Sequence, residues 1–319
     1  MSEPDAPPAV EPSAAFLEEI QTMGLRTPGR PGAHAASGHG SRALPAPPAP
    51  APPAGARPDL RARVRNALGE LDTALRRTLR EPCLAADVRR DRELAAGLRS
   101  TSTGCRRVLV LSAGPGSGQS TVAALLALSL ARVRADRVAA LDLDPLTEVL
   151  AQRLGAPDAT TTDEVLAAST QTRWRGVAPA RGGVVVVRSQ TGAHDATRLE
   201  RALVAVERSV AVTVVDPGPA PAALAGLLQG ATGLVVAAPA GSTAAVGRVL
   251  GLVQDLGHGV LAAHAVAALR GPAPGGALPE RSVVLPDDPA LTGELDLSRT
   301  SPATRRAATR LALQAVRPR

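Results

Sequence analysis

The sequence predicts an α/β fold with a doubly wound, mostly parallel sheet, preceded by a Pro/Ala-rich tail and a basic helical segment. Three observations predict it. Short apolar runs alternate with longer helical runs from residue 107 onward, the short runs are apolar at successive positions, and a glycine-rich turn follows the first of them. Continuously apolar runs are typical of strands buried on both faces, and right-handed crossovers between such strands produce a doubly wound sheet.

Seven apolar runs are expected to form strands, at residues 108–111, 138–141, 184–187, 211–215, 233–237, 260–268 and 283–285. Ser301 followed by Pro302 predicts a capped final helix, because proline suits the first helical position. We favour packing of this helix on the domain over a role at a membrane surface. Residues 155–182, which include Trp174, are expected to form a mobile connection.

Composition divides the chain into three parts. Residues 1–58 hold a disproportionate share of the prolines and are expected to be disordered. Residues 59–104 form a basic helical segment, with leucines at three- and four-residue steps over 59–80. Residues 105–319 form the main domain. The net charge is +7 without any lysine, and the arginine excess over 57–107 is either a solvated face or a surface for DNA, membrane or protein.

Several classes of function are disfavoured by composition. With one Phe, one Trp and no Tyr, the chain lacks the rings on which single-stranded nucleic acids stack. Cys83 and Cys105 are far apart and the five histidines are scattered, which argues against a disulfide framework or a zinc site. No stretch reaches the roughly 20 apolar residues of a spanning helix. We therefore expect a soluble, cytoplasmic protein.

The turn after the first strand, residues 112–121, reads SAGPGSGQST and precedes an apolar helix. Glycines allow the backbone to approach an anion closely, and the helix N-terminus adds partial positive charge, so this pattern predicts a phosphate cradle. The pattern G-x-x-x-x-G-K-[ST] is matched only in part, because Gln119 replaces the lysine and Ala113 the first glycine. The dinucleotide pattern G-x-G-x-x-G fails, because Gln119 occupies its third glycine position.

Acidic residues follow two other predicted strands. Asp142 and Asp144 follow the run 138–141, and Asp216 follows the run 211–215. The carboxyl ends of parallel strands meet at one edge of a sheet, so we expect these acids beside the cradle. An apolar strand followed by an acid is the arrangement of a Walker B motif. A turn or cap role for Asp142 remains an equal alternative.

On these residues the chain resembles the ParA/MinD family of deviant-Walker ATPases, in particular its actinobacterial branch associated with type VII secretion. The resemblance covers about residues 105–316. The family's K-G-G-x-G-K-[ST] falls on residues 114–120, where Gly114 and Gln119 replace the two lysines. Its D-x-D-P element matches residues 142–145. Residues 283–289, 293–297 and 301–305 resemble the closing segment of that branch.

The resemblance implies ATP and Mg²⁺ as cofactors. It implies that Asp144 orients the attacking water, that Ser120 and Asp216 hold the metal, and that Gly218 meets the γ-phosphate. It also implies that Ala267 replaces the asparagine with which the family reads adenine. The other expected nucleotide contacts all lie in the cradle: Gly114, Gly116, Ser117, Gly118, Gln119 and Thr121, together with Ser120.

Loss of the lysines leaves three hypotheses open, because Gln119 cannot offset the charge that builds up in phosphoryl transfer. The first is an ATPase-family switch that binds ATP weakly, dimerises, hydrolyses slowly and acts with a partner protein in secretion or chromosome partitioning. The second is a pseudo-ATPase interaction module, paired with itself or with a lysine-bearing related ATPase. The third is a basic accessory protein that binds DNA through residues 57–107.

Overall fold

The computed structural model describes residues 89, 91–98, 105–144, 147–169, 179–189, 196–218, 224–272 and 278–317. The chain divides into two units, Met1–Leu25 with Asp91–Arg319, and Arg26–Arg90. The predicted tail (1–58), the leucine-striped helix (59–80) and Trp174 lie outside the described residues. The account below therefore concerns the first unit.

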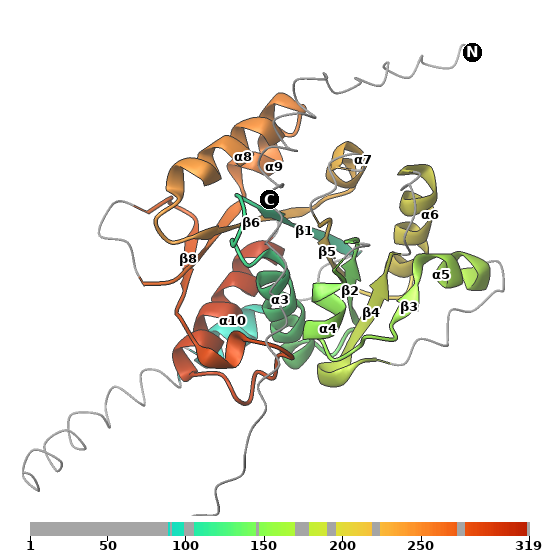
Figure 1. Cartoon of the computed structure of the whole chain (residues 1–319), viewed down its shortest axis with the longest axis horizontal. Helices are drawn as coiled ribbons and strands as arrows, with labels where there is room; N and C mark the ends of the chain where they lie inside the picture. Colours follow the sequence, from blue (N-terminus) through green and yellow to red (C-terminus); the bar gives the residue numbers. More distant parts are fainter. Residues whose placement is uncertain are drawn as a thin grey trace, which may run out of the picture. The chain divides into compact units, whose positions relative to one another are not determined.

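An eight-stranded sheet forms the centre of this unit (Figure 1). Its spatial order is β3-β4-β2-β5-β1-β6-β7-β8, and every neighbouring pair is parallel. The predicted doubly wound parallel sheet is thus confirmed. The strands are β1 (Arg106–Ser112), β2 (Val138–Asp142), β3 (Thr160–Thr161), β4 (Val184–Arg188), β5 (Val212–Asp216), β6 (Gly233–Pro239), β7 (Val266–Arg270) and β8 (Ser282–Leu285).

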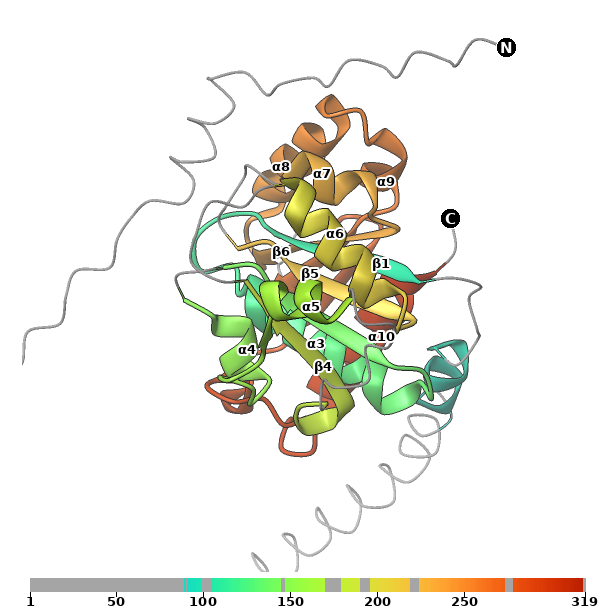
Figure 2. The same ribbon diagram turned by 90° about the vertical axis from the view of Figure 1, so that its right-hand side faces the viewer.

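Helices cover both faces of the sheet (Figure 2). One face packs against α3 (Gln119–Val133), α4 (Val149–Arg153) and α10 (Pro302–Val316). The other packs against α5 (Thr162–Ser169), α6 (Ala196–Glu207), α7 (Leu224–Gln229), α8 (Thr243–Asp255) and α9 (Gly259–Ala263). Side chains of β1 alternate between the two cores, with Val108 and Val110 on one side and Leu109 and Leu111 on the other.

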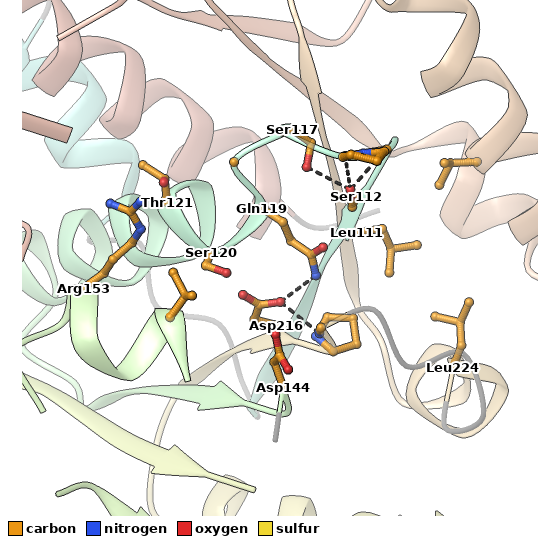
Figure 3. Close-up of a pocket in the computed structure, with 18 of the residues that line it drawn as sticks. Leu111, Ser112, Ser117, Gln119, Ser120, Thr121, Asp144, Arg153, Asp216 and Leu224 are labelled. Carbon is orange, nitrogen blue, oxygen red and sulfur yellow. Dashed lines mark hydrogen bonds between the residues drawn. The ribbon is translucent and has the colours of Figure 1, made fainter. Parts of the chain in front are cut away.

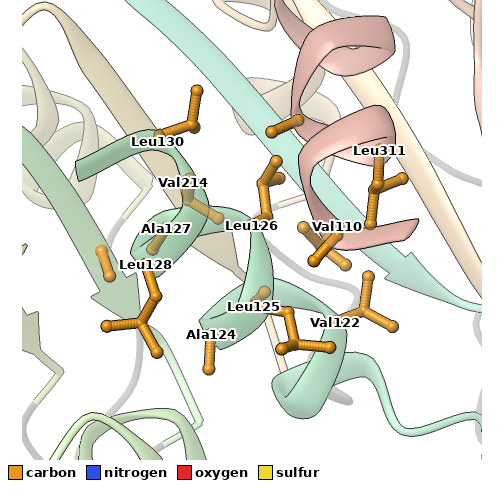
Figure 4. Packing of buried hydrophobic residues seen from close by; sticks show 14 of the residues in the cluster. Val110, Val122, Ala124, Leu125, Leu126, Ala127, Leu128, Leu130, Val214 and Leu311 are labelled. Carbon is orange, nitrogen blue, oxygen red and sulfur yellow. The ribbon is translucent and has the colours of Figure 1, made fainter. Parts of the chain in front are cut away.

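Helix α3 is the element that fixes the turn after β1. Its residues from Thr121 to Leu130 are all buried. Figure 4 shows Leu126 between the sheet residues Val110 and Val214 and the α10 residue Leu311. A helix enclosed on several sides cannot shift without opening cavities, which are costly in a close-packed core. Its N-terminus is therefore held at the carboxyl edge of the sheet.

The prediction of a single strand over 260–268 is wrong for the first half of that range. Helix α9 takes up Gly259–Ala263, and β7 starts only at Val266. The apolar run 260–263 is rich in alanine and leucine, which favour helix, and Val260 is 63% exposed, so apolar character there does not mean burial in the sheet. The strand begins where its backbone can pair with β6, at the register Val235 to Val266.

The expectation of a long mobile connection over 155–182 is wrong for its described first part, which contains β3 and α5. A capping box starts α5: Thr161 Oγ1 accepts from the Glu164 N–H at 3.2 Å, and Glu164 Oε2 accepts from the Thr161 N–H at 2.7 Å. The sequence T-x-x-E was the signal for this helix. The edge strand β3 has only two residues, too few to give a periodic pattern.

The final helix begins as predicted, with Ser301 as its N-cap accepting from the Thr304 N–H at 3.1 Å. Asp288 reinforces this start, because its carboxylate accepts from the Ser301 N–H and the Thr304 hydroxyl, each at 2.7 Å, and from the Ala290 N–H at 3.0 Å. Leu311 and Ala312 have no exposed surface, so α10 packs on the domain as expected. Within the described residues, no helix has the length and apolarity needed to cross a bilayer.

These hydrogen bonds lower the pKa of Asp288 from 3.8 to about 2. The carboxylate therefore stabilises the fold fully above about pH 4, and this stabilisation is lost as the pH falls through 2. Asp288→Ala should lower the free energy of unfolding by about 1–3 kcal/mol at pH 7. The difference from wild type should shrink below pH 4. Urea unfolding at several pH values measures both effects. Asp287→Ala, at the exposed neighbour, is the control, and an equal loss in the two variants would refute the anchoring role.

Candidate functional site

A cavity of about 540 Å³ opens at the carboxyl edge of the sheet, beside the glycine-rich turn. This volume is within the range of small-molecule sites. Its apolar lining includes Leu111, Val149, Leu224, Val249 and Leu252, and Figure 3 labels Leu111 and Leu224 among them. Ten of the residues predicted from the sequence to contact nucleotide or metal line this one cavity: Gly114, Gly116, Ser117, Gly118, Gln119, Ser120, Thr121, Asp144, Asp216 and Gly218.

The turn is held in shape by its own polar groups. Gly116 and Gly118 have φ values of 73° and 72°, in the left-handed region that favours glycine. The Gly114 N–H donates to Ser112 Oγ at 3.0 Å, and the hydroxyls of Ser112 and Ser117 are hydrogen-bonded at 2.9 Å. The buried side of the turn is thus tied to the end of β1. Its other side borders the cavity.

The N-terminus of α3 is open to an anion. Gly118 is its N-cap and supplies no side-chain acceptor, and the first turn contains no acidic residue. The first helical bond runs from the Val122 N–H to the Gly118 carbonyl at 2.9 Å. The N–H groups of residues 119–121 therefore have no acceptor within the helix. Together with the helix dipole, they make this end of α3 suitable for a phosphate.

Gln119 stands where the sequence resemblance places a lysine, and its side chain turns toward the sheet. Its Nε2 donates to Asp216 Oδ1 at 2.6 Å (Figure 3) and to the Val110 carbonyl at 3.0 Å. Both amide hydrogens are thereby used inside the protein. The side chain keeps the contact between α3 and β5 but brings no positive charge to the cradle.

Asp216, at the end of β5, is 1% exposed. Its Oδ1 also accepts from the Gly218 N–H at 3.1 Å, whereas its buried Oδ2 has no hydrogen-bond partner in the described part of the chain. Burial raises the pKa of Asp216 to about 7. The nearby Ser120 hydroxyl and the Gly218 N–H oppose the rise, and the charges of Asp142 and Asp144 add to it. A buried carboxylate oxygen without a donor is a place where a cation would be stabilised.

The two acids after β2 have different environments. Asp142 is 1% exposed and accepts from the Asp144 N–H at 3.2 Å and the Ala151 N–H at 2.9 Å, which fixes the loop between β2 and α4. Burial raises its pKa. Of the two roles left open for Asp142, the turn role fits this geometry, since its side chain does not line the cavity.

Asp144 faces the cavity, and the Thr147 hydroxyl donates to its Oδ2. Gly218, with φ of 62°, lies directly against it, since a Cβ added to this glycine would be 2.7 Å from the Asp144 Cβ. The segment after β5 and the segment after β2 are therefore in contact at the cavity. Any larger residue at position 218 would displace Asp144.

Two arginines at this site were missed from the sequence. Arg153, the last residue of α4, lines the cavity near Thr121 (Figure 3). Arg270, the last residue of β7, lies over the turn: a Cβ added to Gly118 would be only 2.0 Å from its Nη1. Arg270 follows an apolar strand directly, which was a usable signal, whereas nothing in the sequence marked Arg153.

The position assigned to base reading is wrong. Ala267 is 4% exposed in the middle of β7 and pairs with Val236 and Ser282. It does not line the cavity. Only the last residues of β7 reach the carboxyl edge of the sheet, so the replacement of an asparagine at Ala267 has no bearing on a ligand in this cavity.

The raised pKa of Asp216 predicts a pH dependence of stability. Because the folded-state value of about 7 lies above the ordinary 3.8, this group favours folding at low pH, and that contribution is lost as the pH rises from about 4 through 7. Asp216→Asn should keep the bond from Gln119 and raise the free energy of unfolding at pH 8 by roughly 2–4 kcal/mol. Urea unfolding at pH 5 and pH 8 measures this. Asp255→Asn, an exposed acid on α8, is the control, and equal pH profiles for wild type and Asp216→Asn would contradict the prediction.

No family model and no curated protein sequence matches the chain. Among solved structures, MinD from Pyrococcus horikoshii OT3, complexed with Mg-ADP, matches at 16% identity and a TM-score of 0.52, over 65% of this chain and 94% of that one. Cobyrinic acid a,c-diamide synthase from Mycobacterium smegmatis, with a bound ATP analog and magnesium, matches at 18% identity and a TM-score of 0.47, over 64% of this chain and 91% of that one. A ParA family ATPase from Chlorobium tepidum TLS matches at 16% identity and a TM-score of 0.41, over 57% of this chain and 73% of that one. The match to MinD, together with the all-parallel sheet and its flanking helices, shows that the chain has a ParA/MinD-like P-loop fold.

Proposed function

We propose that this protein is a ParA/MinD-like nucleotide-binding protein that binds ATP with Mg²⁺ weakly and hydrolyses it slowly or not at all. It would act through nucleotide-dependent association and not through rapid turnover. The observation that carries the proposal is the 2.6 Å hydrogen bond from Gln119 to Asp216, in a cradle whose amide groups are otherwise suited to phosphate.

Phosphate binding is supported by the shape and charge of the turn. The free N–H groups at the start of α3 converge on the cavity, and no acid of the first helical turn competes for them. The apolar side chains in the cavity lining, among them Leu224, Val249 and Leu252, would suit the flat ring of a base. A cavity with both features suits a nucleotide better than a free inorganic anion.

Magnesium binding is supported by two oxygen donors. Asp216 Oδ2 is buried without a partner among the described residues, and the Ser120 hydroxyl lies beside it. Carboxylate, hydroxyl and phosphate oxygens are the ligands that Mg²⁺ prefers. Ser120 and Asp216 would hold the metal, whose charge would be shared with the phosphate oxygens. Ionisation of Asp216, opposed by burial in the free protein, would accompany metal binding.

Slow hydrolysis follows from the missing charge. A neutral amide directed at Asp216 cannot stabilise negative charge on a phosphoryl group in the transition state, and Pro115 supplies no N–H to the turn. Loss of one preorganised donor of this kind costs about 10²–10³ in rate. Asp144 lines the cavity beside Gly218, which supports assigning to it the orientation of an attacking water molecule in a slow turnover.

Association is the expected output of such a protein. The proposed partners are a second copy of the chain or a related lysine-bearing ATPase, and a protein of a secretion or partitioning system in the cytoplasm. In the family that the chain resembles, the lysine at the position of Gly114 reaches the nucleotide bound by the partner subunit. Glycine cannot do this, so a lysine-bearing partner would have to supply that charge. The basic segment 59–104 is a second candidate surface for partners or DNA. The competing candidate is an interaction module that has lost nucleotide binding, since the same neutral Gln119 weakens the cradle.

Titration calorimetry and thermal unfolding with Mg-ATP and Mg-ADP test the proposal. Wild type should be stabilised by about 2.7 kcal/mol at a hundredfold excess over Kd. Gln119→Lys should bind Mg-ATP at least about tenfold more tightly and hydrolyse it faster, because it adds the missing charge. Gln119→Met, of similar size but without charge or amide, is the matched control.

Absence of stabilisation of wild type at millimolar Mg-ATP would eliminate nucleotide binding and leave the interaction module. Equal affinities for Gln119→Lys and Gln119→Met would show that the missing charge is not what limits binding.

A further inference from the structure

We propose that Arg153 and Arg270, here called the arginine pair, bind the phosphate chain of the ligand beside the cradle and supply the positive charge that Gln119 lacks. The inference deepens the proposed function, because it assigns ligand-binding residues to the same cavity. It concerns residues on α4 and β7, outside the glycine-rich turn.

Arg270 is held against the turn by the position of β7 in the sheet. It is the last residue of the strand, opposite Pro239 of β6 and Leu285 of β8. Its Nη1 and Cδ would lie 2.0 and 2.7 Å from a Cβ on Gly118, so the guanidinium packs on the N-cap of α3. A positive charge placed there adds to that of the helix N-terminus.

Arg153 approaches the same helix end from α4. Its Nη1 donates to the Leu291 carbonyl at 2.7 Å and the Gly293 carbonyl at 3.3 Å, which anchors the side chain at the rim of the cavity. Its Nε is buried and has no hydrogen-bond partner among the described residues. Burial lowers the pKa of Arg153, and the nearby charge of Arg270 lowers it further. The positive charges of the two guanidinium groups therefore repel each other.

The arginine pair differs from three other arginines of the domain, each of which forms an ion pair with an acid. Arg107 forms ion pairs with Glu200 at 3.0 Å and Glu207 at 2.6 Å. Arg134 pairs with Asp136 at 2.9 Å, and Arg188 pairs with Glu148 at 2.5 Å. Within the described part of the chain, neither member of the arginine pair has an ion pair with an acid, and Arg270 has no side-chain hydrogen bond.

Two like charges held together without a counter-ion destabilise the free protein. An anion between them would reverse the sign of that interaction. Guanidinium groups match phosphate oxygens with two parallel donors and cannot lose their charge near neutral pH. The open amide groups of α3 lie next to the arginine pair and favour the same kind of ligand. The geometry thus points to a polyphosphate chain that bridges cradle and arginines.

The test measures binding of inorganic tripolyphosphate and of Mg-ATP to the full chain by titration calorimetry. Arg270→Ala is the main variant, because this side chain forms no hydrogen bond or ion pair within the described residues. It should weaken tripolyphosphate binding by about tenfold, the effect of one charged hydrogen bond. Its melting temperature without anion should equal or exceed that of wild type, because the repulsion with Arg153 is removed. Arg208→Ala, at an exposed position after α6, is the matched control and should change neither quantity.

Arg153 is tested separately, because its bonds to the 291–293 loop contribute to folding. Arg153→Met removes both the charge and the paired donors and should lose about tenfold in tripolyphosphate affinity, whereas Arg153→Lys keeps the charge and should lose less. If wild type binds Mg-ATP and both Arg270→Ala and Arg153→Met bind it equally well, the arginine pair is refuted and the proposed function stands. If tripolyphosphate binds in an arginine-dependent manner but Mg-ATP does not bind, the arginine pair stands and the nucleotide function fails. No binding of tripolyphosphate to wild type overturns the arginine pair.

Discussion

The hydrogen bond between Gln119 and Asp216 joins the first residue of α3 to the last residue of β5, and the candidate site depends on it. A carboxylate that is 1% exposed needs a donor, because an unpaired buried charge is costly. A lysine at this position would provide charge to Asp216 and to a phosphate. Glutamine provides only the hydrogen bond. The architecture of the cradle can thus be maintained while its electrostatics change, which separates the fold of the site from its catalytic power.

The charges around the cavity show the same difference between the architecture of the cradle and its electrostatics. The turn has glycines at positive φ and free backbone amides at the start of the enclosed helix α3, and neither feature requires a lysine. Positive side chains are found instead at the ends of α4 and β7, as Arg153 and Arg270. A site arranged in this way favours binding of an anion over chemistry on it, because binding needs net attraction whereas transition-state stabilisation needs donors at one defined place.

Much of the fold could be predicted from the sequence, because parallel strands buried on both faces produce continuous apolar runs and the acids after them share one edge of the sheet. The same pattern was misleading at 260–263, where an alanine-rich run forms the partly exposed α9. Edge strand β3 was too short to detect, and the capping box of α5 was overlooked. The placement of Ala267 failed because register within a strand, which decides which residue reaches the edge, is set by tertiary pairing. The inward orientation of Gln119 depends on the burial of Asp216 and cannot be derived from the turn sequence alone.

The account is tested most directly by the ionisation of Asp216, followed by carbon NMR of its labelled carboxyl group as a function of pH. Without ligand, we expect a titration midpoint near 7, because burial and the charges of Asp142 and Asp144 oppose the charged form. With saturating Mg-ATP, the group should stay ionised down to a much lower pH, since a cation would then lie beside Oδ2. A midpoint near 4 without ligand, unchanged by Mg-ATP, would contradict both the buried carboxylate and its proposed metal.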